Sequence, residues 1–163
     1  MKLLKNEDIK ELQIKAAKSA RKRGHHVLNP APDDPIQRLC VAIDRGSYIR
    51  PHRHAEESKW ELFIVLQGSA SVLTFDDEGR ITEKIELSSK GKAQAVEIPG
   101  NTWHTLAAQE NGTILFEIKP GPYAPLHEHD FAPWAPMEGT DRAVIFEELF
   151  HSTKQGSLIT DNN

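Results

Sequence analysis

The chain has 163 residues, 38% of them hydrophobic, which is enough for the core of one globular domain. Its 20 Lys and Arg residues against 24 Asp and Glu residues leave a net charge of −4, so no overall positive field attracts a nucleic-acid backbone. The N-terminal MKLLKNEDIK lacks the apolar core of a signal peptide, and no run approaches the roughly 18 apolar residues that span a membrane. We therefore expect a cytoplasmic protein with neither a nucleic-acid nor a membrane partner.

The first expected element is a helix that Asn6 caps and Gly24 stops, with apolar residues at helical spacing between them. Three prolines in residues 25–35 predict an irregular connection after this helix. Residues 1–29 are thus assigned to an N-terminal helix and a connection.

Eight short runs of strand-forming residues follow, separated by turn signals such as DRGS, DDEG and PGN. Runs at this spacing predict an all-β antiparallel sandwich or barrel. They cover residues 37–43, 47–54, 60–66, 70–75, 80–87, 93–98, 103–108 and 113–119.

The end of the chain changes character after Lys119. A segment with five prolines and several aromatic residues is too rigid and apolar for a free linker, so we expect it to pack over the barrel or its mouth. Thr140 or Asp141 can cap a last short helix, and the polar residues from His151 predict a mobile tail. Residues 30–139 are therefore assigned to the barrel with its closing segment, and residues 140–163 to the short helix and tail.

Three histidines and a glutamate form the pattern that carries chemistry. His52 and His54 stand two positions apart, so a strand would point both imidazoles to one face. Glu61 begins an apolar run, where a buried carboxylate needs a metal ion or a cationic side chain beside it. The turn IPGNTWH delivers His104 to the start of another strand, and Asn101 tolerates a positive φ there. The pattern indicates a metal site, with an ion pair of Glu61 as the alternative.

The two segments resemble the paired motifs of the cupin superfamily. Gly46 precedes His52 by six positions and Gly68 follows Glu61 by seven, as the first motif of that superfamily requires. In the second motif, His104 stands five positions after Pro99.

Two positions depart from these motifs. Six residues separate His54 from Glu61, more than is usual, so Glu56 or Glu57 competes with Glu61 as the acidic ligand. In the second motif the glycine is Gly100, and Asn101 holds the next position, where the motif has its glycine.

A narrower resemblance is to the WbuC-type cupin-fold metalloproteins, a bacterial group associated with surface-polysaccharide gene clusters. It rests on the segments DPIQRL, RPHRH, KWELFIVLQG, FDDEGR, IPGNTWH, KPGPY and DFAPWAP. The resemblance spans about residues 30–139 and implies a double-stranded β-helix, or jelly-roll, barrel that forms a homodimer. It also implies one divalent metal ion bound by four residues, which are His52, His54, Glu61 and His104. Three imidazoles and a carboxylate suit Fe, Mn, Ni, Co, Cu or Zn.

Other polar residues are candidates for contact with a substrate. Strand alternation places Tyr48 and Arg50 on the face of His52, and Arg38 and Glu117 also alternate toward the interior. An arginine inside a barrel more often neutralises a carboxylate, so Arg38 and Arg50 are also candidate partners of Glu61. The second HxH pair, His127 and His129, lies in the proline-rich segment without a third ligand in pattern and is interpreted as incidental.

The leading functional hypothesis is a metal-binding cupin that acts on or binds a small polar molecule, with the metal as Lewis acid. A carbohydrate intermediate of surface-polysaccharide metabolism is the suggested ligand, and isomerisation or epimerisation a suggested reaction. The second hypothesis is an Fe(II)-dependent dioxygenase. The third is a metal-stabilised binding or regulatory module without turnover.

Overall fold

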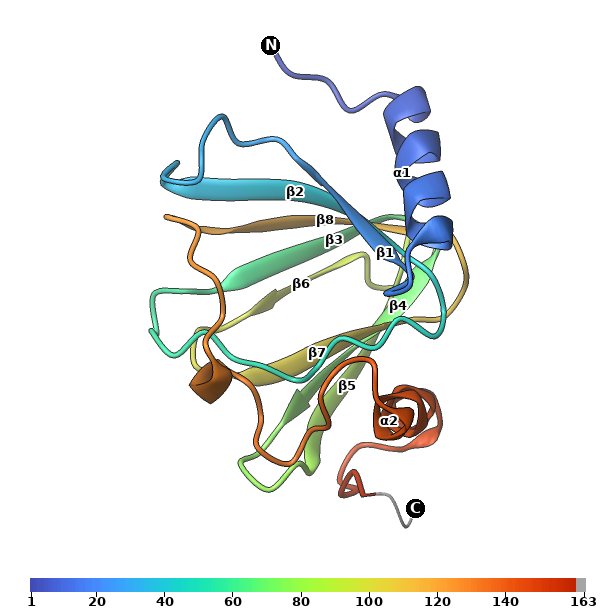
Figure 1. The fold of residues 1–163 in the computed structure, drawn as a ribbon, viewed down its shortest axis with the longest axis vertical. Helices are drawn as coiled ribbons and strands as arrows, with labels where there is room; N and C mark the ends of the chain where they lie inside the picture. The colour runs from blue at the N-terminus through green and yellow to red at the C-terminus, as the bar shows by residue number, and fades with distance from the viewer. Residues whose placement is uncertain (161–163) are drawn as a thin grey trace.

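The computed structural model describes residues 1–160 and contains two antiparallel sheets that face each other (Figure 1). The larger sheet has the strand order β1-β2-β8-β3-β6, and the smaller one β5-β4-β7. The predicted all-β barrel with an N-terminal and a short C-terminal helix is confirmed. The elements are α1 (Asn6–Lys18), β1 (Arg23–Val27), β2 (Ile36–Ile43), β3 (Glu61–Gln67), β4 (Ser69–Phe75), β5 (Ile81–Ser88), β6 (Ala95–Ile98), β7 (Trp103–Ala108), β8 (Thr113–Pro120), the 3₁₀ turn η1 (Glu128–Asp130) and α2 (Asp141–Ser152).

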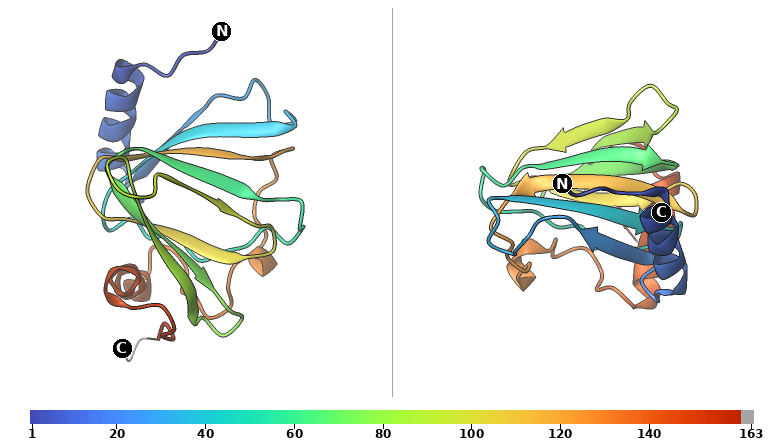
Figure 2. Two further views of the ribbon diagram at one scale, coloured as in Figure 1. Left: turned by 180° about the vertical axis from the view of Figure 1, so that it is seen from behind. Right: turned by 90° about the horizontal axis from the view of Figure 1, so that it is seen from above.

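Alternating side chains of the strands divide the interior into three apolar clusters. The central cluster lies between the two sheets and includes Phe63 of the larger sheet and Val72 of the smaller. Helix α1 lies beside the larger sheet and α2 beside the smaller one (Figure 2). Leu12 of α1 joins the cluster on the outer face of the larger sheet, and Phe150 of α2 joins the cluster on the outer face of the smaller one. No helix within residues 1–160 is long and apolar enough to cross a membrane.

The connection predicted for residues 25–35 is wrong at its start, because residues 23–27 form strand β1. This strand pairs antiparallel with β2, with His25 opposite Val41 and His26 opposite Cys40. It is an edge strand with three exposed residues, so its polar sequence RGHHV carries no alternating apolar signal.

Residues 47–54, predicted as a strand, form no regular strand. Pro51 has no N–H to donate to a sheet ladder, and it is fully buried. Only His52 in this segment makes β-bridges, one to His104 and one to Phe131. The segment is therefore an extended strap along the end of β7.

The residues after α2 differ from the mobile tail that the sequence predicts, as far as residue 160. Gly156 N donates to Ile81 O at 2.8 Å, and Ile81 N donates to Ser157 O at 2.9 Å. Ile159 is 3% exposed and joins the cluster under α2. The polar composition of the segment masks the apolar anchor Ile159. The end of the predicted tail, residues 161–163, lies outside the described residues.

The cluster under α2 generates the first prediction. Phe150→Ala removes a fully buried ring that stacks with Tyr48, so the free energy of unfolding should fall by about 3–5 kcal/mol. Val144, on the same helix, is 66% exposed, and Val144→Ala should change it by less than about 0.5 kcal/mol. Urea denaturation of both variants measures the difference. Equal effects would contradict the placement of α2.

Candidate metal centre

Backbone contacts bring His52, His54, Glu61 and His104 together. His52 N donates to His104 O at 3.1 Å, and His104 N donates to His52 O at 2.9 Å. In the turn before β7, Asn101 adopts a φ of 59° and donates its N–H to His54 O at 2.7 Å. Glu61 is the first residue of β3, in the larger sheet. The four side chains thus come from the strap and from strands β3 and β7, and the turn before β7 ties the strap to β7.

The Glu61 carboxylate lies between two imidazoles. His54 Nε2 lies 3.0 Å from Glu61 Oε1, and His104 Nε2 lies 2.8 Å from Glu61 Oε2. The ring of His52 is centred 4.5 Å from that of His104 and 5.7 Å from that of His54. One ligand atom each of His52, His54 and Glu61 lies within 4.8 Å of the others. These three residues form a possible metal site, and His104 contacts the same carboxylate.

Hydrogen bonds to backbone carbonyls fix the tautomers of two rings. His52 Nδ1 lies 3.0 Å from Arg50 O, and His104 Nδ1 lies 2.8 Å from Thr102 O. A carbonyl oxygen only accepts, so Nδ1 carries the proton in both rings. In the neutral rings Nε2 then holds a free lone pair, which is the arrangement that metal-binding histidines use.

Two buried atoms at the centre lack hydrogen-bond partners. Glu61 Oε2 and His104 Nε2 face each other at 2.8 Å, but neither makes a hydrogen bond within the described residues. A buried polar atom without a partner is costly. A metal ion between imidazole nitrogens and a carboxylate oxygen would satisfy both atoms, so the residues present fit such an ion.

Sequence reasoning missed Lys119, although it contacts the same carboxylate. Lys119 Nζ donates to Glu61 Oε1 at 2.8 Å and lies 2.7 Å from Glu117 Oε1. Lys119 and Glu117 stand two positions apart on β8, which pairs with β3. The alternation used to place Glu117 inside the barrel also places Lys119 there, so this signal was available in the sequence.

Burial and charge act in opposite directions on these three groups. Burial raises the pKa of Glu61, but contacts with His104 and His54 and the charge of Lys119 outweigh it, and the net pKa is well below the ordinary value. For Glu117 burial prevails over the attraction of Lys119, and its pKa is raised. Burial lowers the pKa of Lys119, but Glu117 and Glu61 raise it more. Lys119 is therefore a cation and Glu61 an anion.

The two fully buried imidazoles have opposite shifts. Burial, with the charge of His104, lowers the pKa of His52 to about 3. Burial also lowers the pKa of His104, but the adjacent Glu61 carboxylate more than compensates, and the net pKa is raised. Of these two rings, His104 therefore takes up a proton first as the pH falls.

The arginines named as candidate partners of Glu61 do not contact it. Arg38 Nη2 lies 3.0 Å from Asp34 Oδ2, and its side chain is 40% exposed. Arg50 Nη1 donates to Glu128 Oε1 at 2.9 Å. The cation beside Glu61 is Lys119, so the predicted pairing with an arginine is wrong.

An inner cavity of about 390 Å³ lies between the sheets, with the four predicted ligands in its wall. Arg50 and Glu117, two of the predicted substrate contacts, also line it. Arg38 and Tyr48, the other two, do not line it. Tyr48 points into the cluster under α2 and donates its hydroxyl to Pro136 O at 2.9 Å. The alternation that put Tyr48 beside His52 fails because the segment is not a regular strand.

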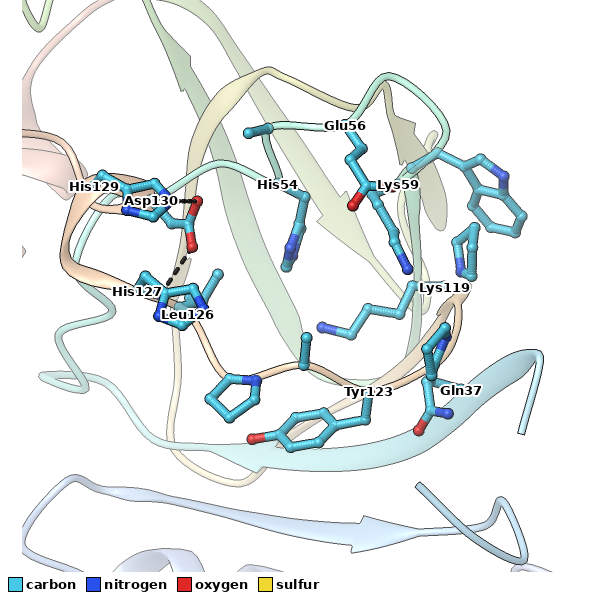
Figure 3. Close-up of a pocket in the computed structure, with 16 residues that line it drawn as sticks. Gln37, His54, Glu56, Lys59, Lys119, Tyr123, Leu126, His127, His129 and Asp130 are labelled. Carbon is cyan, nitrogen blue, oxygen red and sulfur yellow. Dashed lines mark hydrogen bonds and ion pairs between the residues drawn. The ribbon is translucent and has the colours of Figure 1, made fainter. Parts of the chain in front are cut away.

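A second pocket, the vestibule, lies outside the inner cavity and has a volume of about 270 Å³. His54 and Lys119 line both spaces and point toward the centre of the vestibule (Figure 3). Residues 123–126 of the proline-rich segment also line both. This segment therefore forms the wall between the vestibule and the inner cavity.

Competing ligands named from the sequence lie away from the centre. Glu56 and Glu57 are exposed in the loop after His54, whereas Glu61 is 2% exposed. His127 and His129 are exposed, with stacked rings centred 5.4 Å apart, and they line the vestibule. Among the described residues they are not part of a cluster that could hold a metal ion.

The chain matches one family model and is similar to several proteins of solved structure. A family model described as "Domain of unknown function (DUF6016)" matches residues 4–87, and comparison with curated proteins gives no match. The chain is similar in structure to KdgF from Halomonas sp., with 27% identity and a TM-score of 0.48, over 63% of this chain and 82% of that chain. A cupin superfamily protein from Desulfitobacterium hafniense has 17% identity and a TM-score of 0.47, over 60% of this chain and 76% of that chain. An oxalate oxidase in complex with the substrate analogue glycolate has 14% identity and a TM-score of 0.53, over 66% of this chain and 55% of that chain.

The two antiparallel sheets, together with the similarity to the oxalate oxidase structure, confirm the fold class predicted from the two motifs. The narrower WbuC-type assignment, the homodimer and the cytoplasmic location stay predictions.

The turn before β7 generates the second prediction. A Cβ at Gly100 would overlap the carbonyl oxygens of Glu56 and Glu57, the latter at 2.6 Å, so Gly100→Ala should displace the loop that follows His54. We expect the free energy of unfolding to fall by about 1–3 kcal/mol. The nearest atoms to a Cβ at Gly24 are flexible side chains at 3.4 Å, and Gly24→Ala should be close to neutral. Urea denaturation of the metal-free proteins tests this, and two equally stable variants would contradict it.

Proposed function

The chain belongs to the family described as "Domain of unknown function (DUF6016)", and because this description assigns no chemistry, we propose a function from the site itself. The protein binds one divalent transition-metal ion at the inner wall of the barrel. The metal ligands are His52, His54, Glu61 and His104. The inner cavity takes up a small polar molecule beside this ion.

One observation carries the proposal. Glu61 Oε2 and His104 Nε2 are buried 2.8 Å apart, and neither has a hydrogen-bond partner within the described residues. A carboxylate that only neutralised Lys119 would need no imidazole at its second oxygen. The atoms are instead arranged as donors to a shared cation, with His52 and His54 within reach.

The donor set limits the choice of ion. Imidazole nitrogens are ligands of intermediate softness, and the site offers no thiolate, so Fe, Mn, Ni, Co, Cu or Zn are favoured over Ca or Mg. When bound, such an ion supplies Lewis-acid activation of an oxygen atom of the ligand.

The surrounding residues favour a small, polar ligand. The inner cavity of about 390 Å³ combines apolar side chains with the charged groups of Arg50, Glu117 and Lys119. Arg50 is held by Ala135 O and Glu128 at its outer side and reaches the cavity from the strap. A molecule with several oxygen atoms finds both donors and acceptors there. A carbohydrate intermediate, the class that the WbuC-type resemblance suggests, has this character.

Glu61→Gln is the direct test of the metal site. The amide keeps the shape of the side chain but loses the anionic ligand, so metal affinity should fall more than about 100-fold. This exceeds the loss of about 10- to 100-fold that is typical when a residue behind a metal ligand is removed. The metal-free melting temperature should change little, because Lys119 keeps Glu117 as a partner. Metal titration and thermal unfolding are measured on stripped, tag-free protein.

Glu56→Gln is the matched control for this experiment, since Glu56 is the competing carboxylate in the preceding loop, and it should bind metal as the wild type does. Unchanged affinity in Glu61→Gln, with a large loss of metal-free stability, would show that Glu61 serves only as an ion-pair partner. Oxygen uptake by the metal-loaded protein with a panel of sugars and organic acids then separates Lewis-acid chemistry from oxygenation.

Metal affinity should decrease as the pH falls. The adjacent Glu61 carboxylate raises the pKa of His104, so protons compete with a metal ion for this ring at a higher pH than for an ordinary imidazole, whereas burial lowers the pKa of His52 to about 3. Below the pKa of His104 the affinity should fall about tenfold per pH unit for one displaced proton. Calorimetry in two buffers of different ionisation enthalpy counts the released protons. A metal affinity that does not change between about pH 5.5 and 8 would contradict histidine ligands.

A further inference from the structure

Lys119 lies across from Glu61 in the larger sheet. The register pairs Leu62 with Ile118, so the next pair outward places Lys119 opposite Glu61. The Lys119 side chain is 23% exposed and reaches two carboxylates, Glu61 at 2.8 Å and Glu117 at 2.7 Å. An ammonium with two carboxylate partners at these distances has little freedom to move, and it limits the rotation of both carboxylates.

The two oxygens of Glu61 have different surroundings. Oε1 receives Lys119 Nζ at 2.8 Å and lies 3.0 Å from His54 Nε2. Oε2 has no hydrogen-bond partner and faces His104 Nε2. We propose that Lys119 is a positioning residue, which holds Glu61 by Oε1 so that Oε2 alone faces the metal ion. This inference rests on the metal site proposed above.

Metal binding makes Lys119 more important to Glu61. In the metal-free site the proton on His54 Nε2 can be donated to Oε1. An Nε2 that binds a metal ion has given up this proton, so the same atom cannot also donate to Glu61. Of the two groups that hold Oε1, only Lys119 then still donates to it.

Charge and positioning predict opposite signs for the loss of Lys119. A cation close to the site repels a metal dication, so removing it should strengthen binding if charge alone mattered. If Lys119 orients Glu61, its removal should weaken binding, because partners behind a metal ligand typically contribute 10- to 100-fold to affinity. The direction of the change therefore decides between the two roles.

Glu117 permits a variant that separates the loss of Lys119 from the exposure of an unpaired buried carboxylate. Lys119→Met alone leaves Glu117 buried without its cation, which is a separate cause of instability. The double variant Lys119→Met/Glu117→Gln removes the lysine together with its second carboxylate partner. It removes the Lys119 contact to Glu61 Oε1 and leaves no buried carboxylate at position 117 without its cation.

The experiment compares wild type, both Lys119 variants and Lys84→Met. Lys84 is a matched control, because it is a part-buried lysine on β5 whose Nζ donates to His151 O and Thr153 O, away from the cavity. Each tag-free, metal-stripped protein is titrated with Co(II), and the visible absorption bands of the bound ion report its coordination. Circular dichroism of the metal-free proteins checks that they fold.

We expect both Lys119 variants to bind Co(II) 10- to 100-fold more weakly than wild type, with altered absorption bands, and Lys84→Met to match wild type. Binding by Lys119→Met that equals or exceeds wild type would overturn the positioning role, and so would a double variant with the affinity and spectrum of wild type. In either case the metal site itself would stand. Wild-type protein that binds no Co(II) or other divalent transition metal would instead refute the proposed function.

Discussion

The burial of one carboxylate is the constraint on which the site depends. Glu61 is 2% exposed at the first position of β3. Burial of an unpaired anion costs more free energy than the other contacts of one strand residue contribute. The barrel meets this cost with Lys119 on one oxygen and two imidazoles against the carboxylate. Because these partners come from β7, β8 and the strap before β3, compensating one charge fixes the relative positions of several elements.

The same elements are tied by backbone hydrogen bonds that surround the centre. The strap bonds to β7 through His52 and His104, and the turn before β7 bonds back to the strap through Asn101 and His54. Gly100 lets this turn approach the loop closely, since any Cβ would overlap the loop carbonyls. A shift of the strap would therefore move the imidazoles of His52 and His54 together, because backbone hydrogen bonds hold the strap and the turn before β7 to each other.

Sequence patterns predicted the features that residues close together in the chain determine, but they missed the features that depend on pairing between distant strands. Apolar runs and turn signals located seven of the strands, and the HxH spacing with PGN located the histidines. β1 escaped because an edge strand with exposed residues needs no apolar alternation. Strand alternation placed Tyr48 wrongly, because Pro51 interrupts the sheet ladder in its segment. The ion-pair prediction named arginines as partners of Glu61, because the strand register that sets Lys119 opposite Glu61 is a long-range property.

Contacts around the centre also explain how the four proposed ligands can be held in position without an ion. His52 and His104 are each held through Nδ1 by a backbone carbonyl, and Glu61 is held through Oε1 by Lys119. In each case the contact uses an atom other than the one that faces the centre. The ordering cost of these three side chains is therefore met during folding rather than at metal binding. His54 differs from His52 and His104, because its ring contact is the one that Nε2 makes with Glu61 Oε1, the oxygen that Lys119 also holds.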